Sequence, residues 1–369
     1  MMKISNITLY HIQIPFKQAI QTSYGQLTHK ECVVLTLQSD QGLVGLGELT
    51  ALPHPDYVQE FLAGELLVLK RYLIPLLADQ DLTPQSFMQK AAKIRGHQMA
   101  KAAIEMALWD LYAKSQDKSI RAFLPPTLST APVGISLGIQ SSPQDLLAKV
   151  DQAVLQGYQR VKVKIAPGKD YDYLAPIRQK YPNLCLMADA NASYTMAQTA
   201  AIKQLDELDL AMIEQPLRVS DFVEHAKLQA QLSTPICLDE NICQLDDLKT
   251  MIALHSGQVM NLKLPRVGGL MPALEMLAYA QAHQFKVWVG GMYEAGIARA
   301  FHLHFASIKG LDFPADLSAT QHYFEQDVIT QSFVVENGEI KVPKGLGIGV
   351  ELDQQVLARF TLNKFSQKI

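Results

Sequence analysis

The middle of the chain alternates between short apolar runs and longer segments with helical periodicity. The apolar runs are strand-like and include APVGISLGI, RVKVK, LCLMAD, LAMIE, TPICLD, MNLK and KVWVGG. The segments between them carry apolar residues three and four positions apart, as in LMPALEMLAYAQAHQF. Strands that alternate with helices predict a parallel sheet built from βα units. About seven or eight units can be counted, with FPADLS as a short last strand, so the pattern predicts a (β/α) barrel.

A doubly wound parallel sheet is the alternative for the same alternation. Such a sheet normally carries a glycine-rich phosphate-binding loop after its first strand, and the sequence has none at that place. The α/β barrel is therefore the favoured fold class.

The two ends of the chain have a different pattern. Residues 1–52 alternate as antiparallel strands with a hairpin at Gln41-Gly42, and helical patterns follow to about residue 116. The chain after about residue 325 returns to β-structure, with a hairpin at Asn337-Gly338. We predict three parts: an α+β capping domain over 1–125, the barrel over 126–322, and a C-terminal segment, 323–369, that returns to the capping domain.

Charged residues close five of the barrel strands at a nearly constant spacing. They are Lys164, Asp189, Glu214, Asp239 and Lys263, which stand 25, 25, 25 and 24 residues apart. One strand plus one helix gives a period of this length, so the five residues share one phase of the repeat. A single acid at a strand end is usually a surface charge or a helix cap, but three in phase predict one site at the C-terminal mouth of the barrel.

The three acids, Asp189, Glu214 and Asp239, would repel one another strongly unless a cation lay between them. Oxygen ligands suit a hard divalent ion, so we expect Mg²⁺, or another divalent ion such as Mn²⁺. None of the five charged strand-end residues is a Cys or His, which would have suggested zinc.

The two lysines, Lys164 and Lys263, precede and follow the acids in sequence and would face each other across a closed ring. Burial and a nearby metal both lower the pKa of a lysine, toward the range that suits proton transfer. Opposed bases beside a metal suit removal of a proton α to a carboxylate, with the metal stabilising the enolate.

Five weaker candidates are expected to contact substrate near these residues. Lys162 shares a strand face with Lys164 and is expected to pair with an acid or with the substrate carboxylate. Asn191 either binds substrate or closes a strand end, and Ser136 faces the mouth. Gly291 and Met292 either let a ligand approach the backbone or form a tight turn.

Further candidates would act on the site indirectly. Glu294 either holds a base lysine in place or caps the following helix. Arg266 either tunes Lys263 or is an ordinary loop residue. Ser23 and Tyr24 belong to a polar loop that forms either a lid or a solvated turn.

Composition limits the classes of partner. The net charge is −3, with no basic block or nucleic-acid motif, and no apolar run is long enough for a membrane span. The N-terminus lacks the pattern of a signal peptide, and the four cysteines form no CxxC pair, so we expect Cys185 and Cys237 to be buried free thiols. These features predict a cytoplasmic enzyme with a small-molecule carboxylate substrate, with no nucleic-acid or membrane partner, and a homo-oligomer.

Several motifs together resemble one known family. They are TSYG, KAAIEMALWDL, VKVKIAPG, DANASY, IEQP, LDE, NLKLPRVGGL, GGMYEAGIAR and GLGIGVE, and they extend over nearly the whole chain. This set is similar to the o-succinylbenzoate synthase / N-succinylamino acid racemase family of the enolase superfamily, in the muconate lactonizing subgroup.

The resemblance implies Asp189, Glu214 and Asp239 as Mg²⁺ ligands and Lys164 and Lys263 as acid/base residues on opposite faces of the substrate. It implies the syn dehydration of 2-succinyl-6-hydroxy-2,4-cyclohexadiene-1-carboxylate in menaquinone biosynthesis. The alternatives are racemisation of N-succinylamino acids, as a second activity of the same site, or another cycloisomerase or racemase reaction. A non-catalytic metal-binding scaffold is the hypothesis from a different class, and the intact lysines argue against it.

Two positions depart from the patterns of this subgroup. Dipeptide epimerases carry an Asp-x-Asp at the last strand to hold the substrate ammonium, whereas this chain has Asp316-Leu317-Ser318. The motif NLKLPRVGG contains Pro265, which is expected to displace Arg266 and weaken its assistance to racemisation.

Overall fold

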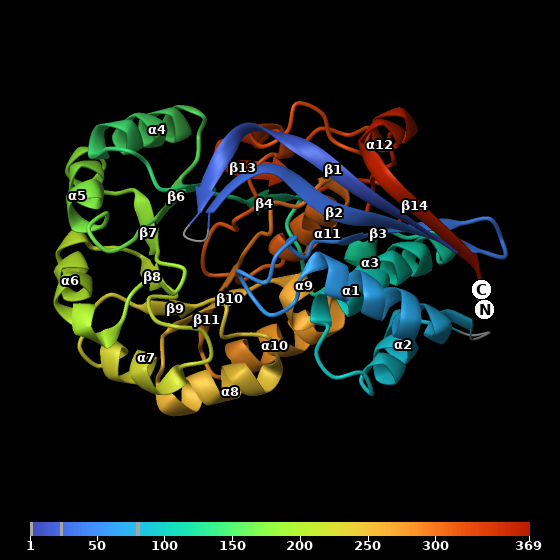
Figure 1. Cartoon of the computed structure of the whole chain (residues 1–369), viewed down its shortest axis with the longest axis horizontal. Coiled ribbons are helices and arrows are strands. Elements are labelled where there is room, and N and C mark those ends of the chain that lie inside the picture. The colour runs from blue at the N-terminus through green and yellow to red at the C-terminus, as the bar shows by residue number, and fades with distance from the viewer. Residues whose placement is uncertain (1–2, 23–24, 79–81) are drawn as a thin grey trace.

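Two structural parts lie side by side in the computed structural model, which describes residues 3–22, 25–78 and 82–369. Figure 1 shows an antiparallel sheet and its helices beside a ring of parallel strands with helices on the outside. Among the described helices, none is long and apolar enough to cross a membrane.

The antiparallel sheet forms the centre of the capping part. Its strands are paired in the order β14-β1-β2-β3, with bounds β1 Ile4–Thr22, β2 Gly25–Ser39, β3 Val44–Leu49 and β14 Thr361–Lys368. Three helices follow: α1 Leu62–Val68, α2 Pro84–Ala91 and α3 Gln98–Ser115. Helix α3 packs directly on β3 because Gly47 has no side chain: a Cβ there would lie 2.3 Å from the carbonyl oxygen of Ala103. The predicted hairpin at Gln41-Gly42 is confirmed by the antiparallel β2–β3 register.

The barrel is a seven-stranded parallel sheet in chain order. Its strands are β5 Ile135–Leu137, β6 Arg160–Lys164, β7 Cys185–Asp189, β8 Met212–Glu214, β9 Ile236–Leu238, β10 Val259–Leu262 and β11 Lys286–Val289. Its helices are α4 Pro143–Leu155, α5 Tyr171–Lys180, α6 Thr199–Gln204, α7 Phe222–Gln229, α8 Leu245–Leu254, α9 Leu264–Val267, α10 Leu270–Ala282 and α11 Gly296–Ala306. This alternation confirms the predicted barrel and excludes the doubly wound order.

An irregular segment closes the ring between β11 and β5. The backbone N–H of Asp316 donates to the carbonyl of Val289 at 2.8 Å, and the N–H of Gly134 donates to the carbonyl of Ala315 at 2.8 Å. FPADLS therefore bridges both edges of the sheet, but as an irregular segment rather than as the regular strand that we predicted.

Below the site, the interior of the barrel holds an apolar cluster next to the buried Arg160, whose guanidinium lies 5.1 Å from the centre of the Trp288 ring. Met187, Met212 and Cys237 lie two residues before Asp189, Glu214 and Asp239, and they pack with Val259 and Trp288. Since residues two apart share a strand face, the acids point inward as predicted. Cys237 is a buried free thiol as expected, whereas Cys185, at the start of β7, is half-buried, so the prediction of full burial for Cys185 is wrong.

The C-terminal part of the chain divides between the two structural parts. The hairpin at Asn337-Gly338 forms from β12 Val335–Glu336 and β13 Glu339–Lys341, but β13 pairs with β4 Thr130–Pro132, which precedes the first barrel strand. The expectation that this hairpin packs on the capping domain is therefore wrong. After α12 Gln354–Phe360, β14 pairs with β1 and extends the capping sheet.

Candidate active site

The five charged strand-end residues come together at one end of the barrel. Asp189 ends β7, Glu214 ends β8 and Asp239 directly follows β9, and all three side chains are at most 1% exposed. The parallel register sets Lys164 beside Asp189, and Asp189 beside Glu214. The sequence spacing thus predicted a real spatial cluster.

The two lysines contact the outer acids of this row. The ammonium of Lys164 donates to Asp189 Oδ2 at 3.0 Å and to the side-chain oxygen of Asn191. The ammonium of Lys263 donates to Asp239 Oδ2 at 2.9 Å. Each lysine therefore reaches the acid row from a different end.

Lys162 lies among the acids and is buried. Its Nζ is 2.9 Å from Glu214 Oε2, 3.1 Å from Asp189 Oδ2 and 3.3 Å from Asp316 Oδ2. Burial by itself would lower the pKa of Lys162, but these carboxylates outweigh it and raise the pKa well above its usual value. Lys162 is therefore a charged partner of the acids, in agreement with its predicted pairing, and is poorly suited to act as a base.

The acid row has the donor chemistry for a hard cation, although its side chains contact protein cations here. Among the described residues, no three Asp, Glu, His or Cys side chains are grouped closely enough to hold one metal ion. Burial and the charge of Asp189 raise the pKa of Glu214 to about 7, against the opposing effect of Lys162. The oxygen-only donors, and the unfavourable ionisation of buried Glu214 beside Asp189, fit a divalent ion. The assignment of Asp189, Glu214 and Asp239 as its ligands remains a prediction.

Arg266 and Lys263 share two partners, Asp239 and Tyr57. The Arg266 guanidinium donates to Asp239 Oδ1 and, at 2.7 Å, to the Tyr57 hydroxyl. Burial would raise the pKa of Asp239, but Arg266 and Lys263 outweigh it and hold that pKa well below its usual range. Pro265 occupies the first turn of α9, where its missing N–H has no helical partner, so it does not displace Arg266 from the site.

Glu294 contacts neither base lysine, so the prediction that it holds one is wrong. Its carboxylate accepts from the backbone N–H of Met292 at 2.7 Å and pairs with Arg299 Nη2 at 2.9 Å and with His302 Nδ1 at 3.1 Å. Arg299 and His302 are buried residues of α11, and Arg299 also lines the central cavity. The alternative prediction, a cap of α11, is also wrong, because the carboxylate of Glu48 accepts from the first turn of this helix.

The remaining predicted residues lie at the mouth, except for the proposed lid. Ser136 faces the mouth and donates to both oxygens of Asp316, at 2.7 and 2.8 Å. The amide of Asn191 donates to Glu240 at 3.0 Å, and Gly291 and Met292 line the central cavity. Ser23 and Tyr24 lie outside the described residues.

Three residues of the site were missed by sequence reasoning: the buried Tyr57 and Glu240, and the half-buried Asp316. Tyr57 comes from a loop of the capping part with no periodic pattern, so the sequence contains no signal for it. Asp316 lies in the irregular segment that closes the ring, and it pairs with Arg160 at 3.1 Å. Glu240 directly follows Asp239, and burial together with Asp239 and Asp189 raises the pKa of Glu240 to about 8.

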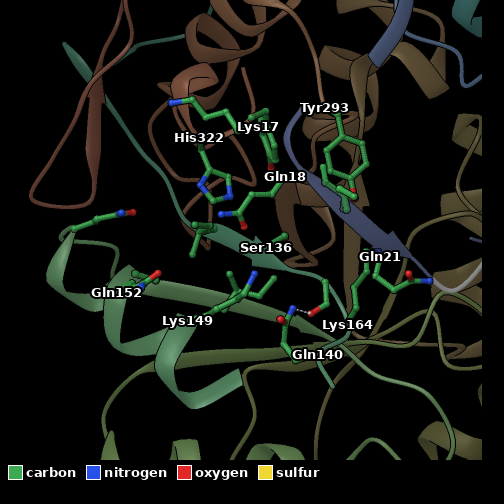
Figure 2. A pocket seen from close by; sticks show the side chains of 18 residues that line it. Lys17, Gln18, Gln21, Ser136, Gln140, Lys149, Gln152, Lys164, Tyr293 and His322 are labelled. Atoms are coloured by element: carbon green, nitrogen blue, oxygen red, sulfur yellow. Dashed lines mark hydrogen bonds between the residues drawn. The ribbon is translucent and has the colours of Figure 1, made fainter. Parts of the chain in front are cut away.

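Two adjoining cavities open beside these residues. The central one, of about 40 Å³, is lined by Lys164, Asp189 and Lys263. The second, of about 280 Å³, shares part of this wall and extends between β1, β5 and α4 (Figure 2). The residues common to both cavities are Ser136, Lys164, Tyr293 and Tyr323.

The larger cavity is positively charged. Lys17, Lys149 and His322 line it together with glutamines, and none of its described lining residues is Asp or Glu. Figure 2 shows Lys149, His322 and Gln18 among the side chains on its wall. Burial and the neighbouring Lys149 lower the pKa of His322 to about 4, so its imidazole is neutral near pH 7. The cavity therefore suits an anionic group that extends from the central site.

Comparison with known proteins agrees with this architecture. The family described as "Mandelate racemase / muconate lactonizing enzyme, N-terminal domain" matches residues 5–124, and the family described as "Enolase C-terminal domain-like" matches residues 145–356. A solved muconate lactonizing enzyme from Pseudomonas fluorescens has the same fold, with a TM-score of 0.92 at 24% identity, over 98% of this chain and 99% of that chain. The fold and site thus define a member of the enolase superfamily.

Relatives with higher sequence identity show to which family of the superfamily the chain belongs. The chain is 48% identical to an o-succinylbenzoate synthase of Enterococcus faecalis, over 98% of each chain. It is 40% identical to an N-succinylamino acid racemase of Thermus thermophilus, again over 98% of each chain. A solved enolase-superfamily protein from Listeria innocua has a TM-score of 0.97 at 41% identity and covers 100% of both chains. The chain belongs to the o-succinylbenzoate synthase / N-succinylamino acid racemase family, whose superfamily depends on divalent metal ions.

Proposed function

We propose that this chain is an o-succinylbenzoate synthase, a hydro-lyase that dehydrates 2-succinyl-6-hydroxy-2,4-cyclohexadiene-1-carboxylate. The observation that carries the proposal is the placement of Lys164 and Lys263 against opposite ends of the buried acid row. Relatives from several bacteria that share 37–48% identity over nearly their full length carry this name. We further propose Mg²⁺ as the cofactor and the cytoplasm as the location.

The residues of the site suit a syn elimination. A bound Mg²⁺ would stabilise the negative charge that develops on the substrate carboxylate. Neutral Lys164 takes the proton from the α-carbon, and the electron pair of that C–H bond forms the enolate, which then expels the oxygen of the 6-hydroxyl group from the same face. The protonated Lys164 then delivers its proton to the leaving oxygen, so that water departs and the ring becomes aromatic. Lys263 stays charged and stabilises the enolate electrostatically.

Racemisation of N-succinylamino acids is the second candidate. It requires one base on each face of the α-carbon, and the contacts of Lys164 with Asp189 and of Lys263 with Asp239, at opposite ends of the acid row, support that arrangement. One removes the proton while the other, already protonated, delivers a proton to the opposite face. Relatives named N-succinylamino acid racemase, at 40% and 36% identity, favour this reaction as an additional activity.

Both candidate substrates carry a second carboxylate on a succinyl arm. The larger cavity adjoins Lys164 and has a cationic wall without acids among its described lining residues. We propose that the succinyl arm occupies this cavity, with Lys149 and Lys17 as its charged neighbours. This arrangement favours a substrate whose acyl arm ends in a carboxylate over a substrate whose acyl arm is uncharged.

The deciding experiment supplies purified enzyme and Mg²⁺ with the cyclohexadiene carboxylate and, separately, with a panel of N-succinylamino acids. We expect the dehydration to have the highest kcat/KM, with measurable racemisation of some amino acids. Efficient racemisation without detectable dehydration would replace the first candidate by the second. Absence of both reactions would contradict the proposed function.

A further inference from the structure

We infer that Lys30 and Glu48 of the capping sheet are positioning residues that hold the barrel segment Gly291–Tyr293 against the active site. The inference rests on the proposed function for its kinetic readout and on the structure alone for its conformational readout. Figure 1 shows β3 beside α11, the helix that follows this segment.

Lys30 makes the first of two contacts from the capping sheet to this segment and the helix start that follows it. It is a lysine of β2 with only 2% exposure, and its ammonium donates to the carbonyl oxygens of Thr50 at 2.9 Å and Met292 at 3.1 Å. Moving an ammonium group from water into the protein interior costs several kcal/mol unless its N–H groups find hydrogen-bond acceptors there. The contact with Met292 joins the capping sheet to the end of the barrel strand, 262 residues later in the chain.

Glu48 makes the second contact, immediately beyond that segment. This residue of β3 is 1% exposed, and its two carboxylate oxygens accept from the N–H groups of Ala295 at 2.9 Å and Ala298 at 3.0 Å. Both N–H groups belong to the first turn of α11, where an anion is stabilised by the helix dipole and satisfies N–H groups that have no helical partner. The capping sheet thus fixes the start of α11 as well as Met292.

The segment between these contacts is strained. Tyr293 has φ +55, a left-handed conformation that aromatic residues rarely adopt. On one side, Met292 is held by Lys30 at its carbonyl and by Glu294 at its N–H, and its side chain packs in the capping core. On the other side, the start of α11 is held by Glu48. Such strain persists only where the surroundings impose it, and here both restraints involve the capping sheet.

The segment Gly291–Tyr293 forms part of the wall of the active site. Gly291, Met292 and Tyr293 line the central cavity beside Lys164, and Tyr293 also lines the larger cavity. If Tyr293 relaxes to an ordinary backbone conformation, the wall that faces the reacting carbon moves. The capping sheet therefore determines the geometry of the barrel mouth through Lys30 and Glu48, in addition to covering it.

The test compares Lys30→Met with Lys101→Met. Lys101 is the matched control, because it is also a buried lysine of the capping part, 5% exposed, and it donates to the Ile94 carbonyl within that part at 2.6 Å. Hydrogen exchange is followed in peptides that cover 290–299, and kcat and KM are measured in parallel. We expect Lys30→Met to exchange at least about tenfold faster in these peptides and to lose about ten- to hundredfold in kcat, with a smaller change in KM. Lys101→Met should change neither, and Lys30→Arg should recover most of the loss because it keeps a donor.

Unchanged exchange and unchanged kcat in Lys30→Met would overturn the inference, as would equal effects in Lys101→Met. If Lys30→Met does not fold, Glu48→Gln is measured in the same way, since it weakens the contact to Ala295 and Ala298 without removing the side chain. Failure of the proposed function is distinguishable: wild-type enzyme would then be inactive on both substrates, and hydrogen exchange alone would decide the inference.

Discussion

The hydroxyl oxygen of Tyr57 lies 2.9 Å from the ammonium nitrogen of Lys263, although 206 residues separate the two in the chain. The same hydroxyl accepts from Arg266 at 2.7 Å and donates to Asp239 at 3.0 Å. One tyrosine of the capping part therefore joins a base lysine, an arginine and a predicted metal ligand of the barrel. Tyr57 orients Lys263 only when the two parts are packed together.

Replacing Tyr57 by phenylalanine should lower kcat while leaving the fold intact. The variant loses hydrogen bonds to charged groups, each contributing roughly 1.5–3 kcal/mol, so we expect a loss of about ten- to hundredfold. Steady-state kinetics of Tyr57→Phe checks this. Tyr171→Phe is the control, because that hydroxyl contacts Glu207 at the surface. Wild-type kcat in Tyr57→Phe would show that Lys263 does not depend on this contact.

The two lysines should act on opposite faces of the substrate. In D₂O, wild-type enzyme should exchange the α-proton of both enantiomers of an N-succinylamino acid, as followed by proton NMR. Lys164→Ala and Lys263→Ala should each abolish exchange from one enantiomer, and the two variants should affect opposite ones. Synthase activity retained in Lys164→Ala would contradict the assignment of Lys164 as the base of the dehydration.

Removal of divalent ions should abolish turnover. Without the metal ion, Lys263 alone is left to stabilise the enolate charge beside the three carboxylates Asp189, Glu214 and Asp239, so EDTA-treated enzyme should be inactive and should recover when Mg²⁺ is added. Asp189→Asn should raise the Mg²⁺ concentration needed for half-maximal activity, because it removes one anionic ligand. Full turnover in excess chelator would refute the metal assignment.

The cationic cavity should select for a second carboxylate on the substrate. Lys149→Ala should raise KM for N-succinylamino acids by about tenfold and should change KM much less for N-acetyl analogues, since the lost contact is a partly buried charge pair. Lys227→Ala provides the matched control, because Lys227 is an exposed surface lysine on α7. Equal effects of Lys149→Ala on succinyl and acetyl substrates would place the succinyl arm elsewhere.

Stability should decline between about pH 4.5 and pH 7 because of Glu105. Burial raises the pKa of this carboxyl from its ordinary 4.5 to about 7, although it accepts from the N–H groups of Leu270 and Met271 at the start of α10. The folded protein therefore keeps a proton that the unfolded chain releases, and this contribution is fully present below pH 4.5 and is lost as pH rises through 7. The difference amounts to roughly 3 kcal/mol.

Urea unfolding at pH 5 and pH 8 checks this dependence. Glu105→Gln cannot titrate, so its stability should fall less between the two pH values than that of wild type, whereas exposed Glu275→Gln should follow wild type. Parallel pH profiles for Glu105→Gln and wild type would show that Glu105 does not titrate in this range.

The sequence by itself determined the barrel and the cluster of charges at its mouth. A repeat of one strand and one helix sets equivalent residues at the same height on neighbouring strands, so constant spacing along the chain becomes proximity in space. Lys164, Asp189, Glu214, Asp239 and Lys263 could be found in this way because local periodicity fixes both their strand face and their strand end.

The tertiary structure decided the remaining features. Glu294 binds Arg299 rather than a lysine because the register of α11 brings that guanidinium to it. Tyr57, Lys30 and Glu48 reach the barrel from loops and strands of the capping part, so their roles depend on how two parts pack. Periodicity describes neighbours within a repeat, whereas contacts between separately folded segments depend on packing over long sequence distances, and no local pattern in the chain specifies that packing.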